Sequence, residues 1–572
     1  MLFDSNQLAV SVLTVLASAS ICAVLIFERK ARSRVARRWA FVLLCACSMA
    51  AMISWFRFGE FHEVFIDADR ADVSATRHKI HHHQLFHFSE FFHYYLGSKY
   101  FRELGYLGLY DCTTLADRDI AAEDRARPRI TGYVRDLEDV LRDRTANEAV
   151  NHCETVERPR FSTQRWSAFK TDARELRRLV PDGWWNDVVR DAGFNPPPSW
   201  IVVASAVANL IPIRWGPVPM YLFATSLDMF LLVACFMACR SAFGATAAVL
   251  ASIYFGASFI ASYGWNGGAF LRFTWIASVV FGLAALKRKR WLLAGCMFGL
   301  AACDRVFPAA FALGAVIPIA HRALHSRDDR KALLRIVSGA AATTAVLVVA
   351  SAAIFGLEPW AMFFVRILKH GDVYYVMHIG LKKVLTFRDW VPSQNFFDHD
   401  GMIRFHDWNL RLRATWAQMR PIAVTIQMLV AIGVVLACLR RRPYEAAVLC
   451  GVATMFFFNL PANYYYAIVS LVPALLFRAS ATASSDSDRM RNYVVLVAFN
   501  LFWTFTLLSS RVWADGIVYD YYICLSLGLF LVFWIAAWLH GDRPALRRVA
   551  LSVLSVGMGR GRSHSRGPHI AS

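Results

Sequence analysis

One stretch of the chain, His81 to Asp111, combines a carboxylate, imidazoles and phenols with closely spaced aromatic residues. As a helix from about Gln84 to Leu104, it would carry an apolar stripe and a polar stripe on opposite faces. The two stripes are Leu85, Phe88, Phe92 and Leu96, and His83, His87, Glu90 and Tyr94. A carboxylate on such a face can remove a proton from a substrate, so Glu90 is a candidate general base. The simpler alternative is a surface helix with solvated charges.

Three basic residues are candidate partners for negative charge that develops in a reaction: Arg272, Arg305 and Lys99. Arg272 lies just inside the outer end of an apolar run, where an ionisable group is a functional candidate by default. The alternative to a functional role is that the Arg272 side chain simply extends toward the membrane interface. Arg305 follows Asp304, and the alternative there is a purely structural ion pair.

Histidines at positions 78, 81, 82, 83, 87 and 93 raise the question of a metal site. His83 and His87 are four residues apart and would share a helix face. No cysteine or paired acid completes a ligand set, so the sequence predicts no metal and no cofactor. A solvated His cluster, or one that contacts lipid headgroups, is the expected outcome.

The elements that must position these residues are apolar. The chain has 572 residues, of which 57% are hydrophobic and 18% charged, and its mean hydropathy is +0.38. A helix needs about 20 residues to cross a 30 Å hydrocarbon core. About thirteen apolar runs approach that length, so we expect an all-α, polytopic membrane protein with about 11–13 transmembrane helices. The runs are 8–27, 39–56, 217–239, 243–262, 269–286, 291–303, 306–320, 336–356, 418–438, 444–459, 462–478, 492–510 and 520–539.

The formal net charge of +20 could indicate nucleic-acid binding, but the basic residues gather in short loops between apolar runs. That distribution follows the positive-inside rule, so we expect no nucleic-acid partner. The long hydrophilic segments 57–198 and 357–417 are then predicted on the outer side. The first run lacks a preceding basic region and is predicted to be a retained span rather than a cleaved leader.

The sequence divides into six parts. These are N-terminal spans (1–56), a large first outer loop domain (57–198), spans with a broken hairpin at 291–320 (199–356), a second outer loop (357–417), C-terminal spans (418–540) and a basic cytoplasmic tail (541–572). The hairpin is expected because basic clusters flank it on both sides, so both ends should face one compartment. Asp304, Arg305 and Pro308 would form its turn.

The first outer segment carries structural signals of its own. Residues 165–179 predict an amphipathic helix, and Pro196 to Pro198 should end any helix before an interfacial or re-entrant stretch at 200–213. Cys112 and Cys153 could form a disulfide in an oxidising compartment, or remain two thiols.

Two motifs resemble a known superfamily. Glu90-Phe91-Phe92-His93-Tyr94-Tyr95, followed by Leu109-Tyr110-Asp111, is similar to the Asp-Phe-x-x-Tyr-Tyr … Leu-Tyr-Asp pattern of GT-C membrane glycosyltransferases. The closest likeness is to polyprenol-phosphate-mannose-dependent mannosyltransferases. Arg305-Val-Phe-Pro308 resembles a segment of the same enzymes. Where they usually have Asp, this chain has Glu90, so Asp69, near Asp67 and Asp72, is a second candidate for the base.

The resemblance implies a GT-C-like fold and an inverting displacement at the outer face of a cell membrane, expected to be a bacterial inner membrane with the site facing the periplasm. A polyprenyl-phosphate sugar would be the donor, and a glycan, lipid or protein the acceptor. Glu90 or Asp69 would be the base, and Arg272, Arg305 and Lys99 would bind the donor phosphate. The substrate-contacting candidates are His93, Tyr94, Tyr95 and Asn463; the last belongs to Asn459–Tyr466, whose tyrosines could equally form an interfacial aromatic belt.

Two other functions remain open from the sequence. A transporter or flippase would use a broken helix and intramembrane charges equally well. A non-catalytic scaffold would tolerate substitution of Glu90 and Arg305.

Overall fold

The computed structural model describes residues 5–27, 33–64, 82–191, 193–211, 213–216, 218–258, 260, 262–387, 399–512 and 516–541. Within these ranges the fold is nearly all-α, as the composition predicts. The named strands form two short antiparallel ladders. One pairs β1 (His62–Val64) with β2 (His82–Gln84), and the other pairs β3 (Tyr133–Arg135) with β4 (Asp143–Thr145).

Eight helices in the described ranges are long and apolar enough to cross a membrane. They are α1 (Ser5–Phe27), α2 (Arg34–Trp55), α11 (Val218–Phe243), α17 (Arg327–Phe355), α20 (His399–Cys438), η8 with α22 (Asn463–Ser470 and Leu471–Ala481), α23 (Asp486–Val512) and α24 (Gly516–Gly541). A multi-pass membrane protein follows from these helices, although eight is fewer than the 11–13 spans expected.

Five further apolar helices account for the difference. They are α12 (Ala245–Gly256), α14 (Thr274–Lys287), α15 (Trp291–Asp304), α16 (Ala309–Ala323) and α21 (Pro443–Phe458). Every apolar run in the sequence falls on one of these thirteen helical segments. The five have 12 to 16 residues, or about 18–24 Å of helix, which is less than the hydrocarbon thickness.

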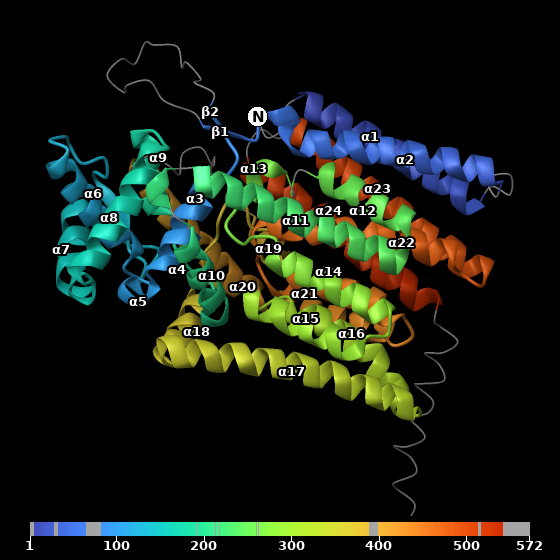
Figure 1. Ribbon diagram of the computed structural model, residues 1–572. Coiled ribbons are helices and arrows are strands. Elements are labelled where there is room, and N and C mark those ends of the chain that lie inside the picture. Colours follow the sequence, from blue (N-terminus) through green and yellow to red (C-terminus); the bar gives the residue numbers. More distant parts are fainter. Residues whose placement is uncertain are drawn as a thin grey trace, which may run out of the picture.

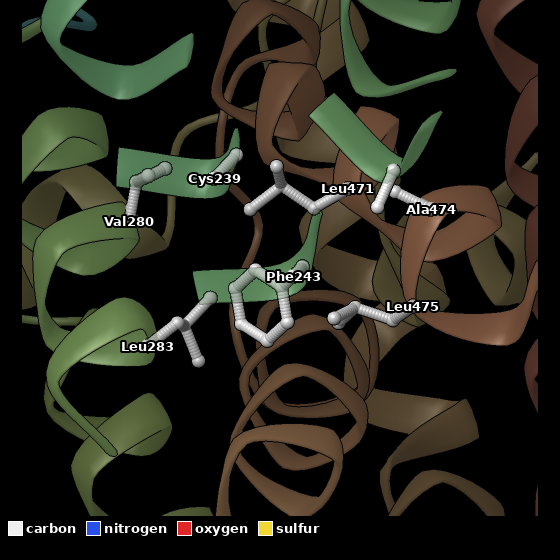
Figure 2. A pocket seen from close by; sticks show the side chains of 8 residues that line it. Cys239, Phe243, Val280, Leu283, Leu471, Ala474 and Leu475 are labelled. Atoms are coloured by element: carbon white, nitrogen blue, oxygen red, sulfur yellow. The ribbon is translucent and has the colours of Figure 1, made fainter. Parts of the chain in front are cut away.

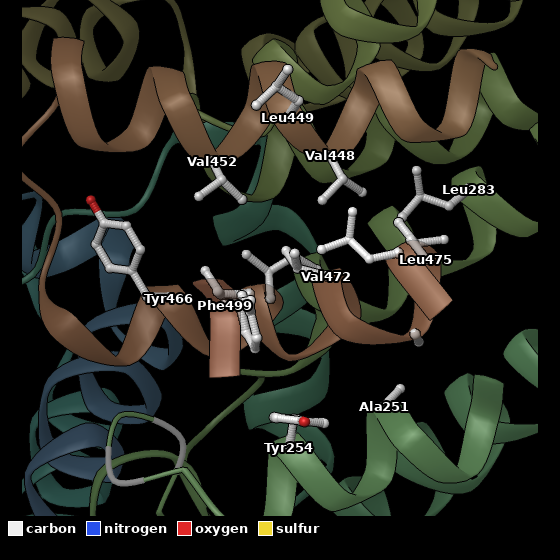
Figure 3. Packing of buried hydrophobic residues seen from close by; sticks show 14 of the residues in the cluster. Ala251, Tyr254, Leu283, Val448, Leu449, Val452, Tyr466, Val472, Leu475 and Phe499 are labelled. Carbon is white, nitrogen blue, oxygen red and sulfur yellow. The ribbon is translucent and has the colours of Figure 1, made fainter. Parts of the chain in front are cut away.

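The core of the membrane region lies between short helices that are apolar on all sides. In Figure 3, Val448 and Val452 of α21 point toward Val472 and Leu475 of α22, while Leu449 lies on another side of α21. A helix that is hydrophobic all round is buried by its neighbours rather than by one partner. Such helices can support residues at their ends without crossing the whole bilayer themselves.

The charged segments separate to opposite ends of this bundle. At one end Lys287 lies over the ring of Tyr444, 5.3 Å from its centroid, and Arg441 donates to the Trp538 carbonyl. At the other end the two long hydrophilic segments are in contact. His406 of the second segment lies 3.6 Å from Asp143 of the first. Figure 1 shows α17 running from one end to the other. The sorting matches the charge pattern of the sequence.

The second of these ends carries a helical unit that we call the head, residues 82–197. It contains α6 (Leu109–Glu123), α7 (Ala146–Val156), α8 (Thr163–Arg178) and α9 (Asp182–Asp187), which cluster beside the bundle in Figure 1. Helix α8 matches the predicted amphipathic helix and buries Trp166, Phe169, Ala173 and Leu176. A disulfide between Cys112 and Cys153, with Cα atoms 5.1 Å apart, joins α6 to α7.

The helix expected at 84–104 is shorter and irregular. Residues 82–84 pair with β1, and the helical path begins only with α3 (Phe88–Glu90). It continues through a π-helix, η3 (Phe91–Leu96), then α4 (Gly97–Lys99) and α5 (Phe101–Leu104). The single predicted helix is wrong, although its polar residues His87, Glu90 and Tyr94 are partly exposed. Phe91, His93 and Tyr95, which lie between the two predicted stripes, are buried like Phe92. The periodicity missed this because the head and the bundle cover the segment from several sides.

The hydrophobic run 291–320 has the expected break. Helices α15 and α16 are separated by Arg305 to Pro308. Helix α10 (Pro198–Leu210), with 13 residues, begins at a proline, which suits the first helical turn because its missing N–H would be unpaired there. The segment 357–417 contains α18 (Glu358–Gly371) and α19 (Leu381–Thr386), and α20 passes unbroken through the boundary placed at 417.

Candidate functional site

Glu90 and Arg272 form an ion pair between the head and the membrane bundle. Glu90 is the last residue of α3, and Arg272 lies in the turn that precedes α14. The Arg272 side chain is 3% exposed and that of Glu90 is 13% exposed. The pair therefore joins residues 182 positions apart in a site almost closed to solvent.

The turn that carries Arg272 is fixed by close backbone contacts. The Gly268 N–H donates to Asp228 of α11 at 2.6 Å, and its carbonyl accepts from the His87 N–H at 2.9 Å. Gly268 has φ +63°, and a Cβ there would lie 2.0 Å from the Leu85 carbonyl oxygen. Only glycine permits that conformation and that approach. This contact sets Glu90 against Arg272.

Two consecutive tyrosines connect Arg272 to Arg305. The Arg272 guanidinium stacks on Tyr464, with its central carbon 3.8 Å from the ring centroid. The rings of Tyr464 and Tyr465 are 4.7 Å apart, and Arg305 donates from Nε to the Tyr465 hydroxyl at 3.1 Å. Stacking and hydrogen bonding thus hold both cations at one place.

Arg305 is also held by its own segment and by the head. It donates from Nη1 to the Asp304 carbonyl at 2.8 Å and carboxylate at 3.0 Å, while Thr274 donates to the other oxygen of that carboxylate. Its guanidinium lies 5.6 Å from the Tyr94 ring and 5.4 Å from the Trp200 ring. The structural ion pair with Asp304 is present. Arg305 nevertheless also contacts Tyr94, which lies one helical turn from Glu90.

We call this set of residues the junction cluster. It comprises Glu90, Tyr94, Trp200, Arg272, Asp304, Arg305, Tyr464 and Tyr465. Five segments far apart in the sequence contribute to it. The arrangement places two guanidinium groups and two carboxylates, Glu90 and Asp304, among aromatic rings, so an anion that binds the arginines would lie next to a proton acceptor.

The ionisation of two neighbours reflects this enclosure. Burial, with a smaller contribution from Arg272, lowers the pKa of His87 to about 3, so this imidazole is neutral. Its Nδ1 has no hydrogen-bond partner among the described residues. Burial and the nearby Glu90 carboxylate raise the pKa of Tyr94. Neither group supplies charge to the site at neutral pH.

Three of the proposed ligand-contacting residues instead make contacts within or beside the head. Lys99 lies 2.7 Å from the Asp172 carboxylate and donates to the Tyr95 hydroxyl. Tyr95 in turn donates to the Ile211 carbonyl, and the His93 ring lies 2.7 Å from the Tyr110 hydroxyl. These partners satisfy the side chains where they are.

Asn463 is placed beside the junction cluster through its neighbour Tyr464. Its backbone N–H donates to the Met377 carbonyl at 2.7 Å, and its side chain is buried. The side-chain Oδ1 has no partner within the described part of the chain. Asp69, the second candidate for the base, and its neighbours Asp67 and Asp72 lie outside the described residues.

The sequence pointed less directly to Tyr464, Tyr465 and Trp200. The sequence marks the tyrosines only as part of the segment Asn459–Tyr466, which could contact sugar or form an aromatic belt, and Trp200 as the start of an interfacial stretch. A signal for them exists in hindsight, because aromatic rings at the membrane interface are preferred partners of arginine. The pairing of each ring with its arginine depends on tertiary contacts.

A metal site has little support in the described residues. The one group of three potential ligand atoms close enough to share an ion is Cys112, Cys153 and Glu157, and the two sulfur atoms are joined in the disulfide. His83 lies on strand β2 while His87 precedes α3, so the two do not share the helix face that the spacing indicated.

A separate pocket lies inside the bundle and is lined only by apolar side chains and one cysteine. Figure 2 shows Phe243 between Leu283 of α14 and Leu475 of α22, with Cys239 and Val280 above. No residue of the junction cluster lines it. It offers no group for acid–base chemistry.

Comparison with known proteins identifies no relative. No protein-family model matches the chain, and no characterised protein or solved structure matches it significantly. The junction cluster and the sequence motifs are therefore the features that bear on its function.

Proposed function

We propose that the chain is a GT-C-like glycosyltransferase that moves a sugar from a polyprenyl-phosphate donor to an acceptor hydroxyl at the outer face of a bacterial inner membrane. The observation that carries the proposal is the junction cluster, in which Glu90, Arg272 and Arg305 share one enclosure. The sequence motifs that resemble GT-C enzymes contain two of these three residues. Geometry and resemblance thus point to the same side chains.

In the proposed reaction the acceptor oxygen attacks the anomeric carbon as the bond from that carbon to the phosphate oxygen breaks. Glu90 takes the proton from the acceptor hydroxyl. The polyprenyl phosphate leaves with an additional negative charge, which Arg272 and Arg305 stabilise. Binding of the phosphate to Arg272 would compete with its ion pair and release the Glu90 carboxylate for the proton transfer.

The position of the cluster suits a lipid-linked donor. Arg272 and Arg305 lie at ends of apolar helices, α14 and α15, and next to the head. A polyprenyl chain would remain among the helices while its phosphate reaches the cluster. The two cations are nearly buried, so their attraction for a phosphate is screened less than at a surface.

One observation favours transport as a second candidate. Arg305 lies where the α15–α16 hairpin is interrupted, and broken helices that expose charge inside a bundle are typical of transporters. The substrate would then be an anionic or lipid-linked molecule that binds the same arginines without a bond being broken.

The test is release of free polyprenyl phosphate from a panel of polyprenyl-phosphate sugars by the purified chain, supplied with an acceptor extract. We expect release by the wild type and almost none by Glu90→Gln, because the amide keeps the shape but cannot take the proton. The loss should be about 10²–10⁴-fold.

Glu103→Gln is the matched control. Glu103 is also paired with an arginine, Arg165, at 2.6 Å, but it lies in the head away from the junction cluster. The Glu103→Gln variant should release polyprenyl phosphate as the wild type does. Equal release by wild type and Glu90→Gln would move the base to another acid such as Asp69. No release by either, with a competent acceptor present, would overturn the enzyme in favour of the transporter.

A further inference from the structure

Helix α18 (Glu358–Gly371) differs from the other helices of the bundle. It is neither a candidate span nor one of the short apolar helices, yet several large apolar side chains on it are exposed. Leu357 just before it, and Phe364, Val365 and Leu368 within it, are 73%, 55%, 52% and 74% exposed. Their spacing of three, four and seven residues puts them on one side of the helix.

The opposite side of α18 holds the head. Phe363 is buried in the head's hydrophobic cluster. Arg366 donates to the Leu137 carbonyl and, at 3.3 Å, to the Asn195 side chain, and Lys369 donates to the Glu138 carbonyl at 3.2 Å. The exposed side is therefore not what attaches this helix to the protein.

The end of α17 fixes where the exposed side lies. Gly356, with φ +83°, ends that span, and Trp360 folds back to donate to the Ser351 hydroxyl at 3.0 Å. Figure 1 shows α18 at the head end of α17. The outward residues Val346, Val349 and Ile354 of α17 are 66%, 66% and 42% exposed. The apolar surface of a membrane-crossing helix thus continues onto α18.

We propose that α18 is an in-plane membrane helix whose stripe of Leu357, Phe364, Val365 and Leu368 inserts among the acyl chains of the leaflet next to the head. An amphipathic helix of this type buries its apolar side about 5–10 Å into the boundary between headgroups and chains. Arg366 and Lys369 then tie the head to that depth. The inference concerns anchoring and holds whether or not the junction cluster transfers a sugar.

Photocrosslinking tests the proposal on the full chain in vesicles of phosphatidylethanolamine and phosphatidylglycerol. The photoreactive residue p-benzoylphenylalanine replaces Phe364 or Leu368 in separate variants, and Arg178, a 63%-exposed head residue, in the control. We expect phospholipid adducts by mass spectrometry at 364 and 368, severalfold above position 178. Adduct yields equal to the control, or crosslinks to a second copy or another protein in place of lipid, would overturn the proposal.

A second readout guards against misfolded variants. Adducts are scored only for variants whose thermal unfolding matches the wild type. The polar substitution Leu368→Asp should then speed amide exchange in α18 in the vesicles, whereas Leu368→Ala should have a smaller effect. Unchanged exchange in Leu368→Asp would also contradict insertion.

Discussion

Two groups of buried charges occupy the head end of the molecule, and they are built differently. The first is the junction cluster. The second, which we call the head cluster, contains Asp111, Asp136, Arg144, His152 and Glu157. Arg144 pairs with Asp111 and Asp136, and His152 lies 3.0 Å from Asp111 and 3.6 Å from Glu157. All five residues come from 47 consecutive positions, beside the Cys112–Cys153 disulfide.

The two clusters use buried charge in different ways. In the head cluster, short-range sequence neighbours neutralise one another around a covalent link, which is typical of a structural network. In the junction cluster, the head meets four other segments of the chain, and each arginine has both a carboxylate partner and aromatic rings against its guanidinium. The ring contacts use none of the N–H donors of an arginine, so a phosphate would have to displace only the carboxylate partner. Loss of the head cluster should affect stability, and loss of the junction cluster should affect activity.

The largest expected effect is on the head. Replacing Cys112 and Cys153 by serine opens a link across a sequence separation of 41, which lowers the free energy of unfolding by about 4 kcal/mol in the chain-entropy treatment. Thermal unfolding of the purified chain measures it, with and without reductant. Reductant should lower the wild-type midpoint and leave the double variant unchanged. A double variant as stable as the wild type would contradict a structural role.

Arg305→Gln should act on the reaction rather than on the fold. Removing one cation that stabilises a leaving phosphate is expected to slow release of polyprenyl phosphate by about 10²–10³-fold. The matched variant Arg144→Gln removes an arginine from the head cluster and should lower the unfolding midpoint with little change in the rate per folded molecule. The reverse pattern would exchange the roles of the two clusters.

The head should become less stable as the pH rises from about 4 to about 7. Burial raises the pKa of Asp111 to about 7, from an ordinary value of 3.8, and that of Glu157 to about 7, from 4.5. The folded head therefore holds more protons than the unfolded chain in this window, and stability falls with increasing pH. Burial lowers the pKa of His152 from its ordinary value of 6.5. Between the lowered pKa and 6.5, the unfolded chain binds more protons at this residue than the folded head does, so His152 partly offsets the trend there.

Unfolding midpoints at pH 5 and pH 7.5 measure that trend. We expect a midpoint several degrees lower at pH 7.5. The double variant Asp111→Asn and Glu157→Gln should reduce the difference, and an unchanged difference would place its origin elsewhere.

The smallest effect concerns the ring beneath Arg272. Tyr464→Leu removes a cation–π contact of about 0.5–2 kcal/mol, which corresponds to about a 2- to 30-fold loss of release. Tyr464→Phe keeps the ring and should remain near the wild-type rate. Equal losses in both variants would point to the hydroxyl rather than the ring.

Local rules predicted most elements and part of the site. The apolar runs, the amphipathic helix at 165–179, the break at 305–308 and the interruption at Pro196 to Pro198 all follow from side-chain type within one or two turns. Arg272 and Arg305 could be selected individually, because charge at the end of an apolar run is costly unless it is used. Glu90 could be selected from its amphipathic segment and from the motif that resembles GT-C enzymes. The irregular path of 82–104 could not be predicted, since it depends on β1 and on the Gly268 turn.

By itself, the sequence determined that this chain is a multi-pass, nearly all-α protein. The length of an apolar run and the charge of a loop are local properties, and they decide which segments enter a bilayer and on which side the loops remain. Only the tertiary structure decided which charges meet. It directed Lys99 and His93 to partners in the head, and it brought Glu90, Arg272 and Arg305 together around Tyr464 and Tyr465. The physical reason is that a buried charge must pair with whichever groups the packing of the chain places next to it. Packing brings together segments that are far apart in the sequence, so these pairs cannot be read from sequence separation.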